Sequence, residues 1–131
     1  FKAEVLTLPH SNSGIYSHTK FQDEGWPKAG VECQVNNTYH DPKKTASIYG
    51  VKDNLTAPAQ DDEWFEVYIK VDGKKVVTKI NGKTIVEGEQ PADAKSGENF
   101  ERVLGEGTFA LQGHDPDSTV LFRNLMVKRL P

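Results

Sequence analysis

Two stretches of the chain, Ser11–Thr19 and Gly30–Thr38, alternate polar with apolar residues in a way that could build a binding surface. In an extended strand, every second side chain points to the same face of the sheet. The polar face of these stretches would carry a phenol, an imidazole, a carboxylate and two amides, from Tyr16, His18, Glu32, Gln34 and Asn36. A merely solvated face usually carries Lys, Thr, Glu and Ser, whereas this set can hydrogen-bond a polyhydroxylated ligand.

The same residues could also transfer protons. Glu32, on the same strand face as the amides of Gln34 and Asn36, could act as a base or accept a hydrogen bond from a hydroxyl group, and the imidazole of His18 could act as acid or base. The alternative is an exposed polar face on which His18 is an ordinary surface residue. A functional face is favoured because the opposite side of the strands is apolar, with Ile15, Val31, Cys33 and Val35.

A second polar pair lies near the C-terminus. Gln112 and His114 alternate with Phe109 and Leu111, so the amide and the imidazole point away from the apolar side of their strand. His114 also opens the turn 114–118 and could instead cap it.

Three more side chains are candidates for ligand contact. Trp26 lies in a Gly-Trp-Pro loop where an indole could stack on a ligand, whereas Trp64 is expected to pack in the core at the start of a strand. Tyr49 fits either core packing or ligand contact. Arg123 interrupts an apolar series, which predicts a β-bulge, and its guanidinium would bind either ligand or a structural carboxylate. The imidazoles and Glu32 could hold a divalent metal, but no ligand spacing specifies such a site.

The segments that carry these residues are predicted to be β-strands. Period-two alternation predicts further strands at Phe1–Leu8, Trp64–Val71, Thr108–His114 and Thr119–Leu130. No segment holds an apolar 3.6-residue period long enough for a helix, and 91–102 is predicted to be a loop. Short strands separated by turns predict an all-β fold, an antiparallel two-sheet β-sandwich.

Two dipeptides predict tight hairpins within this sandwich. Asn81-Gly82 separates Val76–Ile80 from Thr84–Val86 and can supply the two positive φ angles of a type I′ turn. Asp72-Gly73 predicts another such turn, between Trp64–Val71 and Val76–Ile80.

Size and composition indicate one domain spanning residues 1–131, with a formal net charge of -3 and 36% hydrophobic residues. The 16 basic and 19 acidic residues are interspersed, which disfavours nucleic acid and anionic membranes as partners. No apolar run approaches the ~20 residues of a membrane span. Cys33, the single cysteine, is expected to be a small core residue rather than a catalytic thiol, since a thiol in apolar surroundings resists ionisation.

The chain begins at Phe1, already within a predicted strand. We therefore expect an N-terminally incomplete domain in which either a preceding segment or another chain covers an exposed sheet edge.

Strings along nearly the whole chain, in order, resemble a known family, the 3-keto-disaccharide hydrolase domain, formerly a domain of unknown function and often labelled a glycosyl hydrolase. They are SNSGIYSHT, GWP, GVECQVNNT with HDPKKT, SIYGV, DDEWFE, INGK, GTFALQGHDP and FRNLMV. The resemblance implies a concanavalin-like jelly roll whose concave face binds a carbohydrate substrate, and additional strands before Phe1. It also implies a periplasmic, cell-surface or secreted protein.

The activity that the resemblance implies is cleavage of glycosides whose ring carbon 3 is a ketone. The ketone acidifies the hydrogen on carbon 2, so a base can remove it, the enolate expels the aglycone from carbon 1, and water then adds. We expect Glu32 or His18 as the base, with His114 and Gln112 polarising the ketone or protonating the leaving oxygen. No second acidic residue on these faces pairs with Glu32, which disfavours the two-carboxylate mechanism of ordinary glycosidases. A non-catalytic carbohydrate-binding module is the alternative function.

Overall fold

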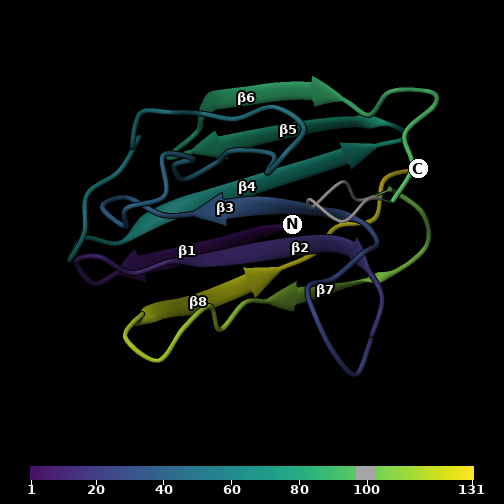
Figure 1. The fold of residues 1–131 in the computed structure, drawn as a ribbon. Helices are drawn as coiled ribbons and strands as arrows, with labels where there is room; N and C mark the ends of the chain where they lie inside the picture. Colours follow the sequence, from purple (N-terminus) through teal and green to yellow (C-terminus); the bar gives the residue numbers. More distant parts are fainter. Residues whose placement is uncertain (97–102) are drawn as a thin grey trace.

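The computed structural model describes residues 1–96 and 103–131, and within them it holds two antiparallel sheets that face each other and no helix (Figure 1). The larger sheet has the order β6-β5-β4-β1-β8, and the smaller has the order β3-β2-β7. The strands of the larger sheet are β1 (Lys2–Thr7), β4 (Phe65–Asp72), β5 (Lys75–Ile80), β6 (Lys83–Glu89) and β8 (Val120–Met126). Those of the smaller sheet are β2 (Ser13–Thr19), β3 (Val31–Val35) and β7 (Thr108–Leu111). The predicted β-sandwich is confirmed.

Both predicted hairpins form, one of them with a different turn. Asn81 and Gly82 connect β5 to β6 with φ values of 48° and 81°, as a type I′ turn requires. Asp72 remains in β4 and pairs with Lys75, so the β4–β5 turn is Gly73-Lys74. Only the first residue of that turn has a positive φ, 61° at Gly73, which is the pattern of a type II′ turn.

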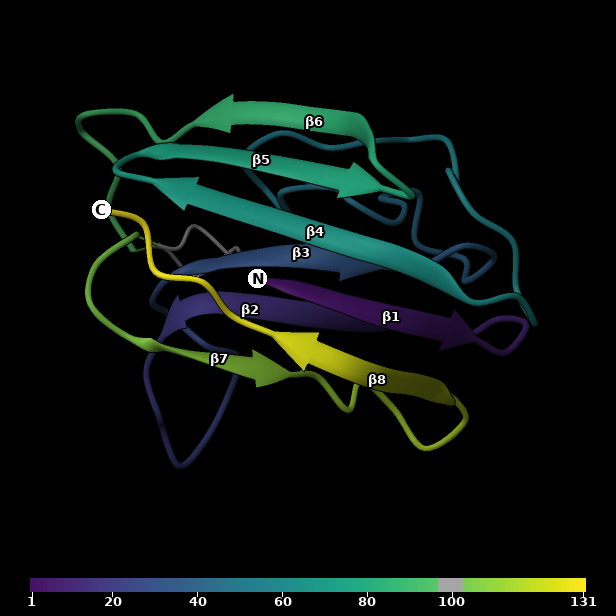
Figure 2. The ribbon, with the colours of Figure 1, turned by 180° about the vertical axis from the view of Figure 1, so that it is seen from behind.

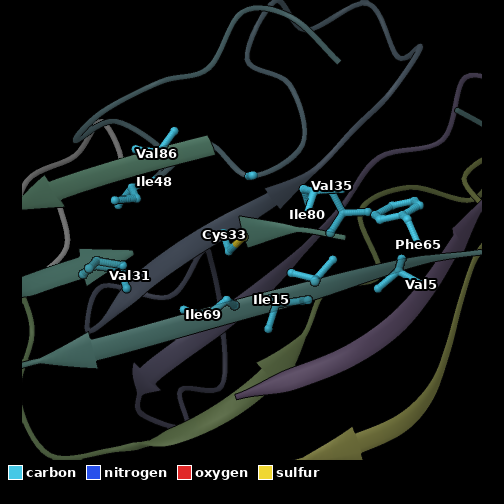
Figure 3. Packing of buried hydrophobic residues seen from close by; sticks show 13 residues of the cluster. Val5, Ile15, Val31, Cys33, Val35, Ile48, Phe65, Ile69, Ile80 and Val86 are labelled. Carbon is cyan, nitrogen blue, oxygen red and sulfur yellow. The ribbon is translucent and has the colours of Figure 1, made fainter. Parts of the chain in front are cut away.

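The core lies between the two sheets, where alternate residues of facing strands meet (Figure 3). Most residues that period-two alternation assigned to it are buried, namely Ile15, Val31, Cys33, Val35, Phe65, Val67 and Ile69. Ala46 and Ile48, from the segment after β3, add to this cluster although they belong to no strand.

The apolar residues of the last two strands depart from the prediction. Leu111 is 41% exposed, and Phe109 and Phe122 are only half-buried. Strands β7 and β8 each end their own sheet, and Figures 1 and 2 show both at the same side of the sandwich. No further strand of the described residues closes this side. The ring of Phe1 covers part of it by stacking on Phe109 at 5.0 Å. A segment or chain that covers this edge stays a prediction.

One segment outside the named strands completes the smaller sheet. Residues 45–49 run beside β3, and backbone bonds join Gln34 N to Ser47 O at 3.0 Å and Tyr49 N to Glu32 O at 3.0 Å. This segment and its flanking loops leave all five residues of β3 buried on both faces. The polar face of the smaller sheet is therefore an enclosed surface and not a solvated one.

The predicted loop 91–102 has no strand or helix in its described part, 91–96, and its remainder, 97–102, lies outside the described residues. Over the part of the chain that the structure describes, no helix is long and apolar enough to cross a membrane.

Candidate functional site

A small pocket lies on the polar face of the smaller sheet, with a volume of about 40 Å³. Strand β3 contributes two of the lining side chains, and loops before β2, after β3 and after β7 contribute most of the rest. The lining side chains are Asn12, Trp26, Glu32, Gln34, Asp41, Tyr49, Gln112 and His114. The sequence-predicted residues Glu32, Gln34, Gln112, His114, Trp26 and Tyr49 are thus brought together.

Glu32 lines this pocket as a buried carboxylate, with 4% of its surface exposed. Its side chain extends over Gly14 of the neighbouring strand, where a Cβ atom would overlap Oε1 and lie 2.9 Å from Cγ. Because glycine has no side chain, β2 leaves the room that the carboxylate occupies. Gly14 is a positioning residue that alternation of polar and apolar types could not reveal.

Gln112 is held against both Gly14 and Tyr16. Its backbone N–H donates to the carbonyl of Gly14 at 2.9 Å, and its Nε2 donates to the Tyr16 hydroxyl at 2.8 Å. Tyr16, 2% exposed, therefore reaches the site through Gln112 although it does not line the pocket itself. The amide oxygens of Gln112 and Asn12 are buried without a hydrogen-bond partner among the described residues. They can accept hydrogen bonds from ligand hydroxyl groups.

His114 is oriented by the residue that follows it. Its Nδ1 lies 2.6 Å from Asp115 Oδ2, and a carboxylate can only accept, so Nδ1 carries the proton. The hydrogen bond with His114, and next that from the Ser118 hydroxyl, hold the pKa of Asp115 below its usual value. Asp115 also accepts from the backbone N–H groups of Asp117 and Ser118, so it is Asp115 that caps the turn. Nε2 of His114 is the nitrogen left for proton exchange with a ligand.

Asp41 and Tyr49 form a hydrogen-bonded pair in the wall of the pocket. The Tyr49 hydroxyl donates to Asp41 Oδ2 at 3.1 Å, and the Lys43 backbone N–H donates to Asp41 Oδ1 at 2.9 Å. Burial and the Asp41 carboxylate raise the pKa of Tyr49 to about 12, so at neutral pH it is a neutral hydroxyl donor. The pairing of residues 45–49 with β3 brings Tyr49 beside Glu32.

Asp41 and Asn12 were not predicted as site residues, since both lie in loops where no alternation of polar and apolar residues marks a face. The sequence predicted that no second acidic residue would pair with Glu32. That expectation is wrong in one respect, because Asp41 lines the same pocket. Its position in the His-Asp-Pro string was the one available signal.

Trp26 lies at the rim, where 45% of its surface is exposed. Its ring is 5.6 Å from that of His114. The Gln22 side chain organises the loop by donating from Nε2 to the carbonyls of Glu24 at 2.8 Å and Trp26 at 2.7 Å. Trp26 is thus presented to both the pocket and solvent.

The structure does not bring His18 into this pocket. Strand β2 changes register with β7 between Tyr16 and Thr19, and His18 itself has a φ of 59°. The irregularity ends the alternation on which its predicted position depended, and His18 Nδ1 instead lies 2.7 Å from the carbonyl oxygen of Gly105.

Asn36 lies behind the pocket rather than in it. The residue is fully buried, and its Nδ2 donates to the carbonyls of Asp41 at 2.9 Å and Lys43 at 3.0 Å. Asn36 thereby fixes the loop that carries Asp41.

Arg123 lies on the larger sheet and forms an ion pair with Glu4 at 3.1 Å, the structural alternative of the two predicted for it. The predicted bulge is present, because the β1–β8 register shifts beside it and Asn124 has a φ of 53°. The Arg123 guanidinium lies 3.8 Å from the ring centroid of Trp64, which is 37% exposed. The core position expected for Trp64 is therefore wrong.

Two further expectations concern metal and thiol chemistry. Within residues 1–96 and 103–131, no three His, Cys, Asp or Glu side chains are grouped so that they could hold a metal ion. Cys33 is buried in the core, and burial followed by the charge of Glu32 raises the pKa of its thiol to about 12. The thiol therefore stays protonated, as its apolar surroundings in the sequence predicted.

Comparison with known proteins identifies related sequences and folds. Residues 1–128 match the family model described as a 3-keto-alpha-glucoside-1,2-lyase-like domain. A crystal structure of a provisionally named glycosyl hydrolase from Parabacteroides distasonis has a TM-score of 0.73 and 22% identity, over 94% of this chain and 73% of that one. Another from the same organism, also provisionally named a glycosyl hydrolase, has a TM-score of 0.75 and 21% identity, over 94% and 67%. These two share the fold. No curated protein matches the sequence.

Proposed function

The chain belongs to the family of 3-keto-alpha-glucoside-1,2-lyase-like domains, and from that premise we propose that it cleaves 3-keto-glycosides by elimination and hydration. The observation that carries the proposal is the enclosure of Glu32 and His114 in one pocket, at the polar face of the smaller sheet. A base and an acid that face the same small space can act on neighbouring atoms of one sugar ring.

Glu32 is the proposed base. Its carboxylate removes the hydrogen on ring carbon 2, and the electrons of that bond form an enolate with the ketone at carbon 3. The side-chain amides of Asn12 and Gln34 are the donors available to the enolate oxygen, since the single hydroxyl proton of Tyr49 is donated to Asp41. Gln112 takes a different role from the one expected from sequence, because its Nε2 donates to Tyr16 and its unpartnered Oε1 suits a sugar hydroxyl.

His114 is the proposed acid. As the enolate collapses, the bond from carbon 1 to the aglycone oxygen breaks, carbons 1 and 2 become doubly bonded, and the leaving oxygen takes a proton from Nε2 of the imidazolium. Asp115, on Nδ1, fixes the ring and stabilises its protonated form. Water then adds across the double bond, with its hydroxyl on carbon 1 and a proton on carbon 2.

A sugar ring needs more room than the pocket provides in this conformation. Ligand sites usually measure some 300 to 1,000 Å³, and this pocket measures about 40 Å³. Trp26 is the lining side chain best able to move, since it stands on a loop and is 45% exposed. We therefore include an outward movement of Trp26 in the binding step, after which its indole can stack on the sugar.

The second carboxylate supports a rival mechanism. Glu32 and Asp41 in one pocket could act as the acid and base pair of an ordinary glycosidase on unoxidised sugars. Against it, both oxygens of Asp41 already accept hydrogen bonds, from Lys43 N and the Tyr49 hydroxyl. Asp41 is better suited to positioning Tyr49 than to proton transfer.

The deciding experiment measures aglycone release from a 3-keto-α-glucoside and from the same glucoside unoxidised. Elimination predicts release from the ketone substrate alone, together with an unsaturated 3-keto sugar detectable by mass spectrometry before hydration. Release from both substrates supports the carboxylate pair, and binding without release supports the carbohydrate-binding module. If Glu32 is the base, Glu32→Gln should lose aglycone release, whereas Glu66→Gln, which makes the same change on the larger sheet, should retain it.

By the same family resemblance, we propose that the protein works outside the cytoplasm, in the periplasm, at the cell surface or secreted. Cell fractionation with detection of the protein tests this directly, and recovery in the cytoplasmic fraction alone would contradict it.

A further inference from the structure

The imidazole of His114 packs against the ring of Tyr39 as well as against Trp26. The centroids of the Tyr39 and His114 rings are 5.3 Å apart, and the rings meet edge to face at 71°. This is a favoured geometry for two aromatic rings. Trp26 lies at 5.6 Å from the same imidazole, but the proposed binding step moves Trp26 outward. During that step Tyr39 and Asp115 can still hold the His114 ring.

The backbone at Tyr39 is fixed on both sides of the ring. The residue before it, Thr38, accepts from the His10 backbone N–H at 2.8 Å and donates its hydroxyl proton to Asp61 Oδ2. The Tyr39 carbonyl accepts from Lys44 Nζ at 2.7 Å. Since a hydroxyl has a single proton, Asp61 receives the one that Thr38 can donate. The position of the Tyr39 ring therefore depends on an acceptor from a distant part of the sequence.

Asp61 is itself anchored to the end of β1. Its other carboxylate oxygen, Oδ1, accepts from the Thr7 hydroxyl at 2.6 Å, and the backbone N–H of Asp62 donates to the Thr7 carbonyl at 2.8 Å. Thr7 is fully buried, and its hydroxyl also accepts from Asn37 Nδ2 at 3.0 Å. One oxygen of Asp61 thus binds the larger sheet, and the other binds the loop that carries Tyr39.

From this series of contacts we propose that Asp61 is a positioning residue for catalysis. It holds Thr38, Thr38 sets the place of the Tyr39 ring, and that ring holds the His114 imidazole at the pocket. The proposal rests on the proposed function, in which Nε2 of His114 protonates the leaving oxygen. Asp61 does not line the pocket, so it acts on the reaction and not on the binding of substrate.

Asp61→Asn tests this role through turnover. An amide has one acceptor oxygen in place of two, so it cannot accept from both hydroxyl groups. We expect kcat on a 3-keto-α-glucoside to fall about tenfold with KM nearly unchanged. Asp62→Asn makes the same change at the next residue, which is exposed and has a φ of 61° that asparagine tolerates, and it should retain kcat. A fall in both variants, or in neither, would overturn the proposal.

Thr38→Val breaks the same link from its other end. Thr38 is exposed, and valine keeps its shape while removing the hydroxyl, so the proposal can be judged even if Asp61→Asn fails to fold. We expect the same loss of kcat as in Asp61→Asn, and no further loss when the two changes are combined. Thr38→Ser, which keeps the hydroxyl, should retain activity. Additive losses in the double variant would show that Asp61 does not act through Thr38.

Nuclear magnetic resonance follows the His114 ring without any substrate. Its ring-proton resonances, assigned by their loss in His114→Gln, respond to the aromatic rings packed against it. We expect them to shift in Asp61→Asn and in Thr38→Val, and to keep their wild-type positions in Asp62→Asn. If the wild type does not cleave the ketone substrate, the proposed function fails and these spectra still decide the inference. Unchanged His114 resonances in both variants would leave Asp61 with a role in the fold alone and overturn the proposal.

Discussion

The Glu32 side chain lies directly over Gly14 of β2, two residues before Tyr16. Because Gly14 has no side chain, it leaves space for the carboxylate. Tyr16 is the register partner of Glu32, and Gly14 is that of Gln34, so the carboxylate leans diagonally across the two strands. The position of the proposed base therefore depends on a residue that has no side chain.

Gly14→Ala should displace the Glu32 carboxylate and lower kcat while the fold persists. The added methyl meets a side chain that can turn aside, and Gly14 is not among the residues with a positive φ. We expect a loss of about tenfold or more in kcat, measured beside the circular dichroism spectrum. Gly105→Ala is the matched control, because its Cβ would meet nothing within 4 Å. Full activity in Gly14→Ala would mean that the carboxylate need not occupy its present position.

Glu32→Gln should preserve the pocket and remove the base. The amide has nearly the same shape but cannot take the carbon 2 proton, so we expect a loss on the order of a hundredfold or more in the rate of aglycone release. Retained turnover in this variant with loss in His18→Ala would move the base to His18. Retained turnover in both variants would exclude both candidates.

Period-two alternation was sufficient to predict the strands and the residues between the sheets, because burial on one face imposes that period on residues such as Val35, Val67 and Ile69. It failed where the backbone leaves regular geometry. His18 sits at a bulge, and Leu111 lies on a strand that ends its sheet. Asp41 was missed because loops have no period, and only the fold brings their side chains to a site.

Asp115→Asn should weaken catalysis by acting on His114. An amide in place of the carboxylate no longer stabilises an imidazolium and no longer requires the proton to be on Nδ1. We expect kcat to fall about tenfold and to respond differently to pH, as seen in pH–rate profiles of the variant and the wild type. Asp72→Asn, at the end of β4 where the carboxylate pairs with Lys70, provides a control without contact to the site. Superimposable profiles for Asp115→Asn and the wild type would leave Asp115 with only its structural role in the turn.

Val67→Ala should reveal the cost of a cavity in the core. Val67 has no exposed surface, and we expect the free energy of unfolding to fall by about 1 to 3 kcal/mol. Leu111→Ala removes more atoms from a residue that is 41% exposed, and it should cost less. Urea denaturation of both variants checks the order of the two values, and the reverse order would show that the β7 edge is covered in solution.

Tyr49→Phe should make the protein less sensitive to alkaline pH. The pKa of Tyr49 is raised from 10.0 to about 12 in the folded state, chiefly by burial and by Asp41, so the folded chain retains a proton that the unfolded chain loses. The stability that this group contributes is therefore complete below pH 10 and is lost as pH rises toward 12. Phenylalanine cannot ionise, so urea midpoints measured from pH 9 upward should decline less steeply in the variant. Tyr68→Phe, on the larger sheet, should keep the steeper decline because Tyr49 is still present. Identical slopes in Tyr49→Phe and the wild type would mean that Tyr49 ionises no less readily in the folded protein than in the unfolded chain.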